Sequence, residues 1–197
     1  MPQIFRKDGD ILDMEYIPGL DMQTYLQHNN ENVLTKFILN TLNSFKSESL
    51  DKDYTEVYND KLKWMDTDVR LPFTRQELIE TLPKVLPQSV YHGDLTLENI
   101  IYSFGKFCMI DPVTVEYDSY IFDIAKLRQD LHCKWFLRNS DLRLDTKLKN
   151  IEDRILQKYP EANNNGLLIL MLLRVYLHTE KNDENYTFIM REIDKLW

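Results

Sequence analysis

Residues 92–99 read HGDLTLEN, and they lie where the pattern of the sequence changes. Short strand-like segments at 89–92, 99–102 and 106–110 surround this stretch and are joined by turns that contain glycine. Outside them, apolar residues recur at three- and four-residue steps, as in amphipathic helices. The sequence therefore predicts one mainly α domain with a small β island, an α+β fold. We expect the chemistry of the protein to lie in that island.

Helices are expected on both sides of the island. Asp21 is a suitable N-cap for the first of them, and Pro83 and Pro87 end the fourth. A strand at 11–17, ended by a Pro-Gly pair, precedes the helices. The expected helices span residues 22–28, 31–45, 54–65, 74–82, 120–137, 146–158, 166–178 and 185–196.

The composition is ordinary for a globular protein and argues against one class of partner. The chain has 197 residues, of which 43% are apolar and 28% charged, enough for one well-buried domain. The formal net charge is −8, and no dense stripe of lysine and arginine is present. Binding to nucleic acid needs many cations against the phosphates, so no nucleic-acid partner is expected.

Several features indicate a cytoplasmic protein. Cys108 and Cys133 lack the spacing of a metal site, and we expect both to be reduced thiols. The N-terminal residues do not show the pattern of a secretory signal. The longest apolar run, 167–173, is too short to span a bilayer, so it predicts a buried core helix and no membrane span.

Two further motifs follow residues 92–99, namely IDP at 110–112 and DIAKL at 123–127. The three motifs together resemble the catalytic loop, the metal segment and the following helix of the aminoglycoside phosphotransferase and choline kinase-like family, which is related to the protein kinases. HGD alone is a weak signal, whereas the full set in this order is far more specific. The resemblance covers about residues 11–131 and implies a phosphotransferase that uses ATP and Mg²⁺.

The resemblance implies a role for five residues. Asp94 would be the catalytic carboxylate, which accepts a hydrogen bond from the acceptor hydroxyl and orients it. His92, in the same catalytic loop, would fix the loop through hydrogen bonds. Asn99 and Asp111 would offer Mg²⁺ the hard oxygen ligands that this ion prefers. Asp123 would support the catalytic loop by binding its backbone.

A second interpretation treats these residues as structural. Asp94 and Asn99 are also common turn formers, Asp111 is a suitable turn or cap residue before a proline, and Asp123 suits a solvated position. The protein would then be a helical scaffold in which the motif is a coincidence. This interpretation predicts an exposed Asp94 away from any cleft and no response to nucleotide.

The segment MEYIPGLD at 14–21 resembles the hinge that joins the two lobes of a kinase-like fold. The resemblance implies that the Glu15 carbonyl and the Ile17 amide contact adenine, and that Met14 lines the back of the nucleotide pocket. An edge strand followed by a turn would explain the same residues. We therefore expect residues 1–18 to be a hinge-strand remnant of an N-terminal lobe, and residues 19–197 to be the helical catalytic lobe.

About ten residues precede the hinge strand, which leaves no room for the family's phosphate-covering loop, its strand lysine and its helix glutamate. The expected fold is therefore the C-terminal lobe of a protein-kinase-like fold with the N-terminal lobe largely absent. Three explanations remain open: completion by a second chain or a second copy, a truncated reading frame, or a lobe that has given up catalysis. A missing lobe would leave apolar surface near the hinge strand, which favours association.

The expected acceptor is a small molecule with a hydroxyl group, such as a sugar, an aminoglycoside or a choline-like metabolite. A finer resemblance at 99–102 and 122–127 points to kinase-like proteins linked to surface polysaccharide. Some side chains are open to two interpretations each. Three acidic residues would either attract a cationic acceptor or form a solvated helix face: Asp141, Asp145 and Glu152. Four aromatic residues would either line a pocket or pack in the core: Trp135, Phe136, Tyr176 and Tyr186. The alternative to an enzyme is a catalytically impaired kinase-like binding or regulatory module.

Overall fold

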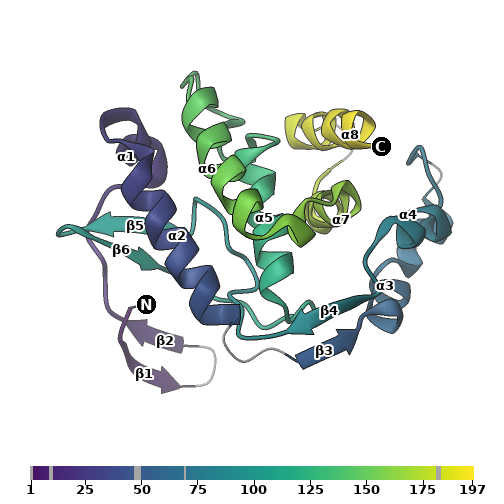
Figure 1. The fold of residues 1–197 in the computed structure, drawn as a ribbon, viewed down its shortest axis with the longest axis horizontal. Coiled ribbons are helices and arrows are strands. Elements are labelled where there is room, and N and C mark those ends of the chain that lie inside the picture. The colour runs from purple at the N-terminus through teal and green to yellow at the C-terminus, as the bar shows by residue number, and fades with distance from the viewer. Residues whose placement is uncertain (1, 9–10, 47–49, 69, 181–182) are drawn as a thin grey trace.

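Helices form most of the structure, and the strands form small antiparallel pairs (Figure 1). The computed structural model describes residues 2–8, 11–46, 50–68, 70–180 and 183–197. The helices are α1 (Met22–His28), α2 (Glu31–Lys46), α3 (Thr55–Lys61), α4 (Arg75–Thr81), α5 (Tyr120–Leu131), α6 (Asp145–Lys158), α7 (Asn165–Tyr176) and α8 (Glu184–Leu196), with 3₁₀ turns η1 (Lys63–Thr67), η2 (Trp135–Leu137) and η3 (Pro160–Ala162). The strand pairs are β1 (Ile4–Asp8) with β2 (Ile11–Met14), β3 (Leu50–Asp53) with β4 (Val85–Gln88), and β5 (Ile100–Ser103) with β6 (Lys106–Met109). The fold is α+β, as the sequence predicts.

Helix α5 lies at the centre of the core. Every residue of α5 is buried, and the helix packs against α2, α6 and α7 (Figure 1). The apolar run 167–173 forms the buried middle of α7, in agreement with the prediction of a core helix. No helix in the described part of the chain is both long enough and apolar enough to span a membrane.

The β5–β6 hairpin is the β island. Its turn consists of Phe104 and Gly105, whose φ angles of 46° and 80° are both left-handed. A two-residue turn with this geometry matches the twist of the flanking strands. The hairpin therefore brings the end of β6, and Asp111 just after it, back beside Asn99, which precedes β5.

The prediction of a strand at 89–92, one of the three expected in the island, is wrong. Strand β4 lies just before these residues and pairs with β3, a pairing that the sequence did not suggest. Strand β3 reads LDKD and is largely exposed, so it lacks the apolar alternation of a half-buried strand. Pro87 is tolerated in β4 because a two-stranded ribbon leaves one edge of each strand free.

Two expected helices are shorter in the structure. The helix expected at 54–65 ends at Lys61 and continues as the tighter turn η1. The helix expected at 120–137 ends at Leu131, and Lys134 then adopts a left-handed conformation with a φ of 61°. Neither end carries a glycine or proline, which are the usual signals for the end of a helix.

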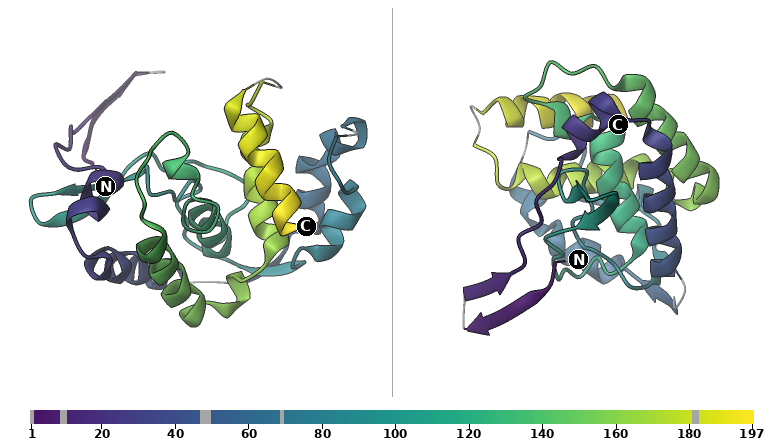
Figure 2. Two further views of the ribbon diagram at one scale, coloured as in Figure 1. Left: turned by 90° about the horizontal axis from the view of Figure 1, so that it is seen from above. Right: turned by 90° about the vertical axis from the view of Figure 1, so that its left-hand side faces the viewer.

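The hinge segment connects an N-terminal hairpin to the β island. Strands β1 and β2 project away from the helical body (Figure 2), and β2 is shorter than the strand expected at 11–17. Leu20 and Tyr102 exchange two backbone hydrogen bonds of 2.9 Å, which join the segment to β5. Gly19 is required there, because a Cβ atom would lie 2.5 Å from the carbonyl oxygen of Tyr102.

Candidate active site

The loop 92–99 is anchored to the first turn of α5. The carboxylate of Asp123 accepts hydrogen bonds from the backbone N–H groups of His92, at 2.6 Å, and Gly93, at 2.9 Å. Asp123 is only 2% exposed, and this burial raises its pKa to about 6, against the lowering effect of the two hydrogen bonds. A buried carboxylate that binds two backbone N–H groups holds the start of the loop in a fixed position.

Asp130 anchors the same loop two turns further along α5. Its Oδ2 accepts a hydrogen bond of 2.7 Å from the backbone N–H of Leu97. Asp130 is fully buried, and desolvation raises its pKa to about 7. Within the described residues, no donor binds its Oδ1, so the charged form is not stabilised at this oxygen. Asp123 and Asp130 are seven residues apart, so they lie on one face of the helix, directly against the loop.

The loop is also fixed to the segment that follows β6. The Nε2 of His92 donates to the carbonyl of Ile110 at 2.9 Å, and the carbonyl of His92 accepts from the N–H of Val113 at 2.8 Å. Burial lowers the pKa of His92, so the neutral ring is favoured. Gly93 has a φ of 83°, and a Cβ atom there would lie 2.0 Å from the carbonyl oxygen of Val113. Only glycine fits this close approach.

The carboxylate of Asp94 lies between two donors. Its Oδ1 is 3.2 Å from the Nζ of Lys126, and its Oδ2 accepts a hydrogen bond of 3.1 Å from the Nδ2 of Asn99. Lys126 belongs to the loop-facing side of α5 that carries Asp123 and Asp130, and its side chain is 9% exposed. Burial lowers the pKa of Lys126, while Asp94 counteracts this effect. The side chain of Asp94 is 33% exposed, so it remains accessible from outside.

Asn99 and Asp111 are brought together by the β5–β6 hairpin. The N–H of Ile110 donates to the carbonyl of Asn99 at 3.0 Å, which places the next residue, Asp111, at the same end of the hairpin. The Nδ2 of Asn99 is used by Asp94, so its Oδ1 is left for another partner. Asp111 has a left-handed φ of 54°, and its carboxylate makes no hydrogen bond or ion pair with any described residue. Two uncommitted oxygen groups at one end of the hairpin are of the kind that a hard cation prefers.

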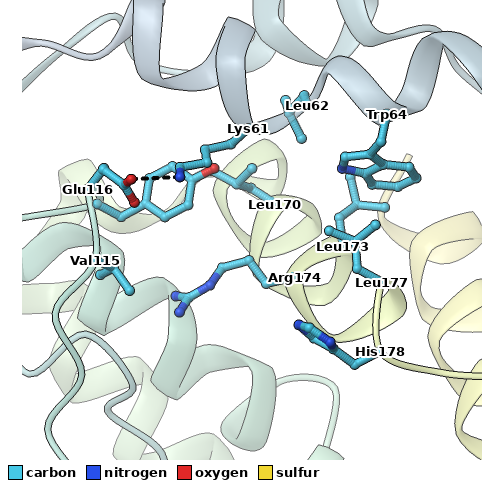
Figure 3. Close-up of a pocket in the computed structure, with 11 residues that line it drawn as sticks. Lys61, Leu62, Trp64, Val115, Glu116, Leu170, Leu173, Arg174, Leu177 and His178 are labelled. Atoms are coloured by element: carbon cyan, nitrogen blue, oxygen red, sulfur yellow. Dashed lines mark hydrogen bonds and ion pairs between the residues drawn. The ribbon is translucent and has the colours of Figure 1, made fainter.

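A cavity of about 220 Å³ lies beside the loop, between α3, η1, the segment 115–117 and α7 (Figure 3). Arg174 of α7 lines it, and its Nη2 donates to the carbonyl of Gly93 at 3.2 Å. Val115, on the opposite wall, would lie 3.3 Å from a Cβ atom added at Gly93 and is therefore close to the same residue. The cavity is therefore adjacent to the residue that precedes Asp94.

The hinge residues lie away from this cavity, on the path from the N-terminal hairpin to β5. Met14 ends β2 and is 39% exposed. The N–H of Glu15 donates to the carbonyl of Gln3 at 2.8 Å. Neither the carbonyl of Glu15 nor the N–H of Ile17 takes part in a hydrogen bond with another described residue, so both remain available to a ligand.

Of the three acidic residues expected either to attract a cationic acceptor or to form a solvated helix face, one is buried. Glu152 is buried and binds Arg128 at 2.9 Å and His132 at 3.2 Å, which lowers its pKa against the effect of burial, so the interpretation of this residue as part of a solvated helix face is wrong. Asp145 is exposed and paired with Lys134, and Asp141 is exposed.

Most of the aromatic residues of interest belong to the core. Trp135 and Phe136 are buried in η2. The ring of Tyr176 is also buried, and it stacks on Trp64 at 5.5 Å and lies 5.6 Å from Tyr186. Trp64 itself lines the cavity, so Tyr176 contributes to the cavity only by supporting this ring.

Three residues of the site do not stand out in the sequence. Lys126 is visible only as part of the DIAKL motif, and no motif marks Asp130 or Arg174. The spacing of Asp123, Lys126 and Asp130 places them on one helix face, and this was an available signal. Arg174 lies about 80 residues from Gly93, and no local pattern connects them.

Comparison with known protein families matches residues 10–155 to the phosphotransferase enzyme family, abbreviated APH. The match covers well over half of the chain and includes the loop 92–99, Asp111 and α5. A search of curated proteins found no match.

Proposed function

The chain belongs to the phosphotransferase enzyme family, and we propose that it transfers the γ-phosphoryl group of ATP to a hydroxyl group of a small molecule. The observation that carries the proposal is the position of Asp94. Its carboxylate is accessible, is held by Lys126 and Asn99, and lies on a loop that two buried carboxylates fix to the core helix. The turn-former interpretation does not predict the contacts that Lys126, Asp123 and Asp130 of α5 make with the loop.

In the proposed reaction, the acceptor oxygen forms a bond to the γ-phosphorus, and the bond from that phosphorus to the β–γ bridging oxygen breaks. ADP leaves with the electron pair of the broken bond. Asp94 orients the acceptor hydroxyl by accepting its hydrogen bond, takes its proton as the new bond forms, and releases it to water. Positioning of the hydroxyl is the main contribution of this carboxylate, because phosphoryl transfer needs little covalent work from the protein.

Lys126 is proposed as the residue that positions Asp94. Its ammonium group binds Oδ1 while Asn99 binds Oδ2, so both carboxylate oxygens are held and one rotamer is favoured. Its positive charge also balances the carboxylate in a partly desolvated place. Lys126 therefore acts through Asp94, as a positioning residue.

Asn99 and Asp111 would hold Mg²⁺. Their oxygens fit the ion, because one carboxylate and one amide oxygen leave the other ligand positions to water and phosphate oxygens, as Mg²⁺ usually requires. When bound, the ion would neutralise phosphate charge. The Glu15 carbonyl, the Ile17 N–H and the Met14 side chain would contact the adenine base.

The test is the thermal stability of the protein with and without Mg·ATP, together with phosphate transfer from labelled ATP to a panel of hydroxyl compounds. A ligand at a hundred times its Kd that binds only the native state adds about 2.7 kcal/mol. We expect a Mg²⁺-dependent rise in Tm that is lost in Asp111→Ala and kept in Asp153→Ala, an exposed control position. A shift without transfer to any acceptor would indicate the binding or regulatory module. No shift, with no transfer, would contradict the proposal.

A further inference from the structure

The cavity beside the loop contains more positive than negative charge. Its charged lining residues are Lys61, Glu116 and Arg174, with His178 at one end (Figure 3). The single carboxylate among them, Glu116, is already paired with Lys61 at 2.7 Å. The protein as a whole has a formal net charge of −8, so the excess of positive charge in the lining of this cavity is opposite in sign to the net charge of the chain.

Arg174 makes no ion pair with a carboxylate in the described part of the chain. Its contacts are the carbonyl of Gly93, the sulfur of Met171 at 3.6 Å and the ring of Tyr117 at 5.7 Å. Its charge also favours the ionised form of the buried Asp123, although the two side chains form no ion pair. A guanidinium group has five N–H donors in a planar fork that matches carboxylate and phosphate oxygens. Most of these donors remain available, and Figure 3 shows the side chain extending from α7 toward Val115.

The same cavity walls offer few free binding groups to a cationic acceptor. Rings such as Trp64 and Tyr117 attract cations in general. Here, however, the ring of Tyr117 already faces the guanidinium of Arg174, and one face of Trp64 is stacked on Tyr176. Two of the three acidic residues expected to attract a cation, Asp145 and Glu152, are engaged elsewhere in the fold.

We infer that this cavity binds the acceptor, and that the acceptor is a small hydroxyl compound carrying a carboxylate or phosphate group. The inference rests on the proposed function for the identity of the bound molecule as an acceptor. Arg174 binds the anionic group, and Leu170 and Leu173 contact the carbon skeleton. A volume of about 220 Å³ suits a single monosaccharide derivative and is small for a drug-sized ligand, whose pockets are about 300–1,000 Å³. The hydroxyl to be phosphorylated then lies near Asp94, which follows Gly93 directly.

The experiment measures binding in the absence of nucleotide, by calorimetry or by Tm shift. The probes share a hexose ring and differ in charge: glucuronate, glucose 6-phosphate, neutral glucose and cationic glucosamine, with choline as a second cation. We expect glucuronate or glucose 6-phosphate to bind at least tenfold more tightly than glucose, and the two cations not to bind. The first two probes also distinguish a carboxylate site from a phosphate site. Equal binding of all the hexoses, preferred binding of a cation, or no binding of either anionic probe would overturn the inference.

Charge variants locate the site. Lys61→Met removes one cation and is expected to weaken anion binding, whereas Glu116→Gln removes the only lining carboxylate and is expected to strengthen it about threefold or more. Both side chains are partly exposed, so neither change threatens the fold. Asp145→Asn, which removes an exposed carboxylate outside this cavity, is the matched control and should bind as the wild type does. If Asp145→Asn strengthens binding as much as Glu116→Gln does, the effect is overall charge and the inference fails.

The two proposals fail in different ways. Anionic probes that bind without ever receiving labelled phosphate would leave the cavity assignment standing and contradict the phosphotransferase proposal. Transfer of phosphate to choline or an aminoglycoside, with no binding of glucuronate or glucose 6-phosphate, would support the phosphotransferase and reject an anionic acceptor.

Discussion

Lys126 is the residue whose role is easiest to separate from stability of the fold. Lys126→Met leaves Oδ1 of Asp94 without its donor, and we expect kcat to fall about 100-fold while KM for ATP changes little, because the loss concerns orientation of the hydroxyl acceptor. Lys126→Arg should restore part of the activity. The measurement is steady-state kinetics over a range of pH.

The control for Lys126 is Lys149→Met, which removes an exposed lysine paired with Asp153. This variant should retain wild-type kcat and KM. If the loss of thermal stability in Lys126→Met is large enough to explain its loss of kcat, and Lys126→Arg restores no activity, the role of Lys126 is purely structural.

Asp130 should make the stability of the protein depend on pH. Its pKa is raised to about 7 by burial, whereas an aspartate in the unfolded chain titrates near 3.9. The native state therefore keeps this proton at pH values where the unfolded chain has lost it. The free energy of unfolding should fall, on the order of 3 kcal/mol, as the pH rises from about 4 to about 7, and level off above that range.

Asp130→Asn tests this dependence, because an amide oxygen can still accept the hydrogen bond from Leu97 and carries no titrating proton. Urea unfolding between about pH 4.5 and pH 8 should show a shallower slope in this variant. A smaller slope of the same sign should remain, because the pKa of Asp123 is also raised, to about 6. Asp153→Asn, at an exposed position, should keep the wild-type slope, and identical slopes in all three proteins would contradict the assignment.

At the scale of residues, the sequence points to those candidate site residues that belong to compact motifs. Asp94, Asn99, Asp111 and Asp123 lie within or between short patterns whose spacing is visible along the chain. Lys126, Asp130 and Arg174 depend on burial and on contacts across the fold. A charged residue in a helix is usually solvated, so nothing in the sequence shows that every position of α5 is buried.

At the scale of elements, the contact between the loop 92–99 and the segment after β6 is testable through Gly93. Gly93→Ala places a Cβ atom 2.0 Å from the carbonyl oxygen of Val113, so the two segments must separate. We expect a loss of about 2 kcal/mol or more in the free energy of unfolding, with activity reduced well beyond what stability explains. Thermal unfolding and kinetics on the same preparation measure both effects.

Gly105→Ala is the matched control. Its φ of 80° is similar to that of Gly93, but no atom lies within 4 Å of the added Cβ. This variant should therefore lose only the cost of a left-handed alanine, about 1 kcal/mol, and keep its activity. If the two variants behave alike, the close approach at Gly93 has no part in organising the site.

The helices and the island hairpin follow from apolar periodicity, and the differences from prediction have local causes. Strand β3 carries alternating charges on an exposed ribbon, and β1 depends on pairing with β2 in a projecting hairpin. Such strands are stabilised by the partner strand and bury little, so a pattern based on burial does not reveal them. The early end of α5 arises from the left-handed Lys134, an unusual conformation for lysine.

At the scale of the whole molecule, the β1–β2 hairpin is a surface suited to association. Ile4, Phe5 and Tyr16 are 60%, 63% and 85% exposed, and a two-stranded ribbon leaves its outer edges unpaired. We expect self-association at high concentration, which Phe5→Asp should weaken by placing a charge on the ribbon. Light scattering as a function of concentration measures it.

Phe104→Asp is the control for this prediction, because Phe104 is 91% exposed at the turn of the other hairpin. This variant should associate as the wild type does. A wild-type protein that stays monomeric at all concentrations, or equal weakening by both changes, would show that the hairpin is not the contact.

The residues that support the loop and those that line the cavity lie mainly on different elements. If the proposed function holds, this separation bears on how the acceptor specificity of the protein can change. Residues that hold Asp94 come from α5 and the β island, whereas most of the cavity wall comes from α3, η1 and the end of α7. In libraries that vary residues 61–64 and 177–178, many clones should therefore remain functional, and some of these should prefer a different acceptor. Libraries of the same size on α5 should yield mostly inactive proteins. A new acceptor specificity would therefore arise without changes to the residues that hold Asp94.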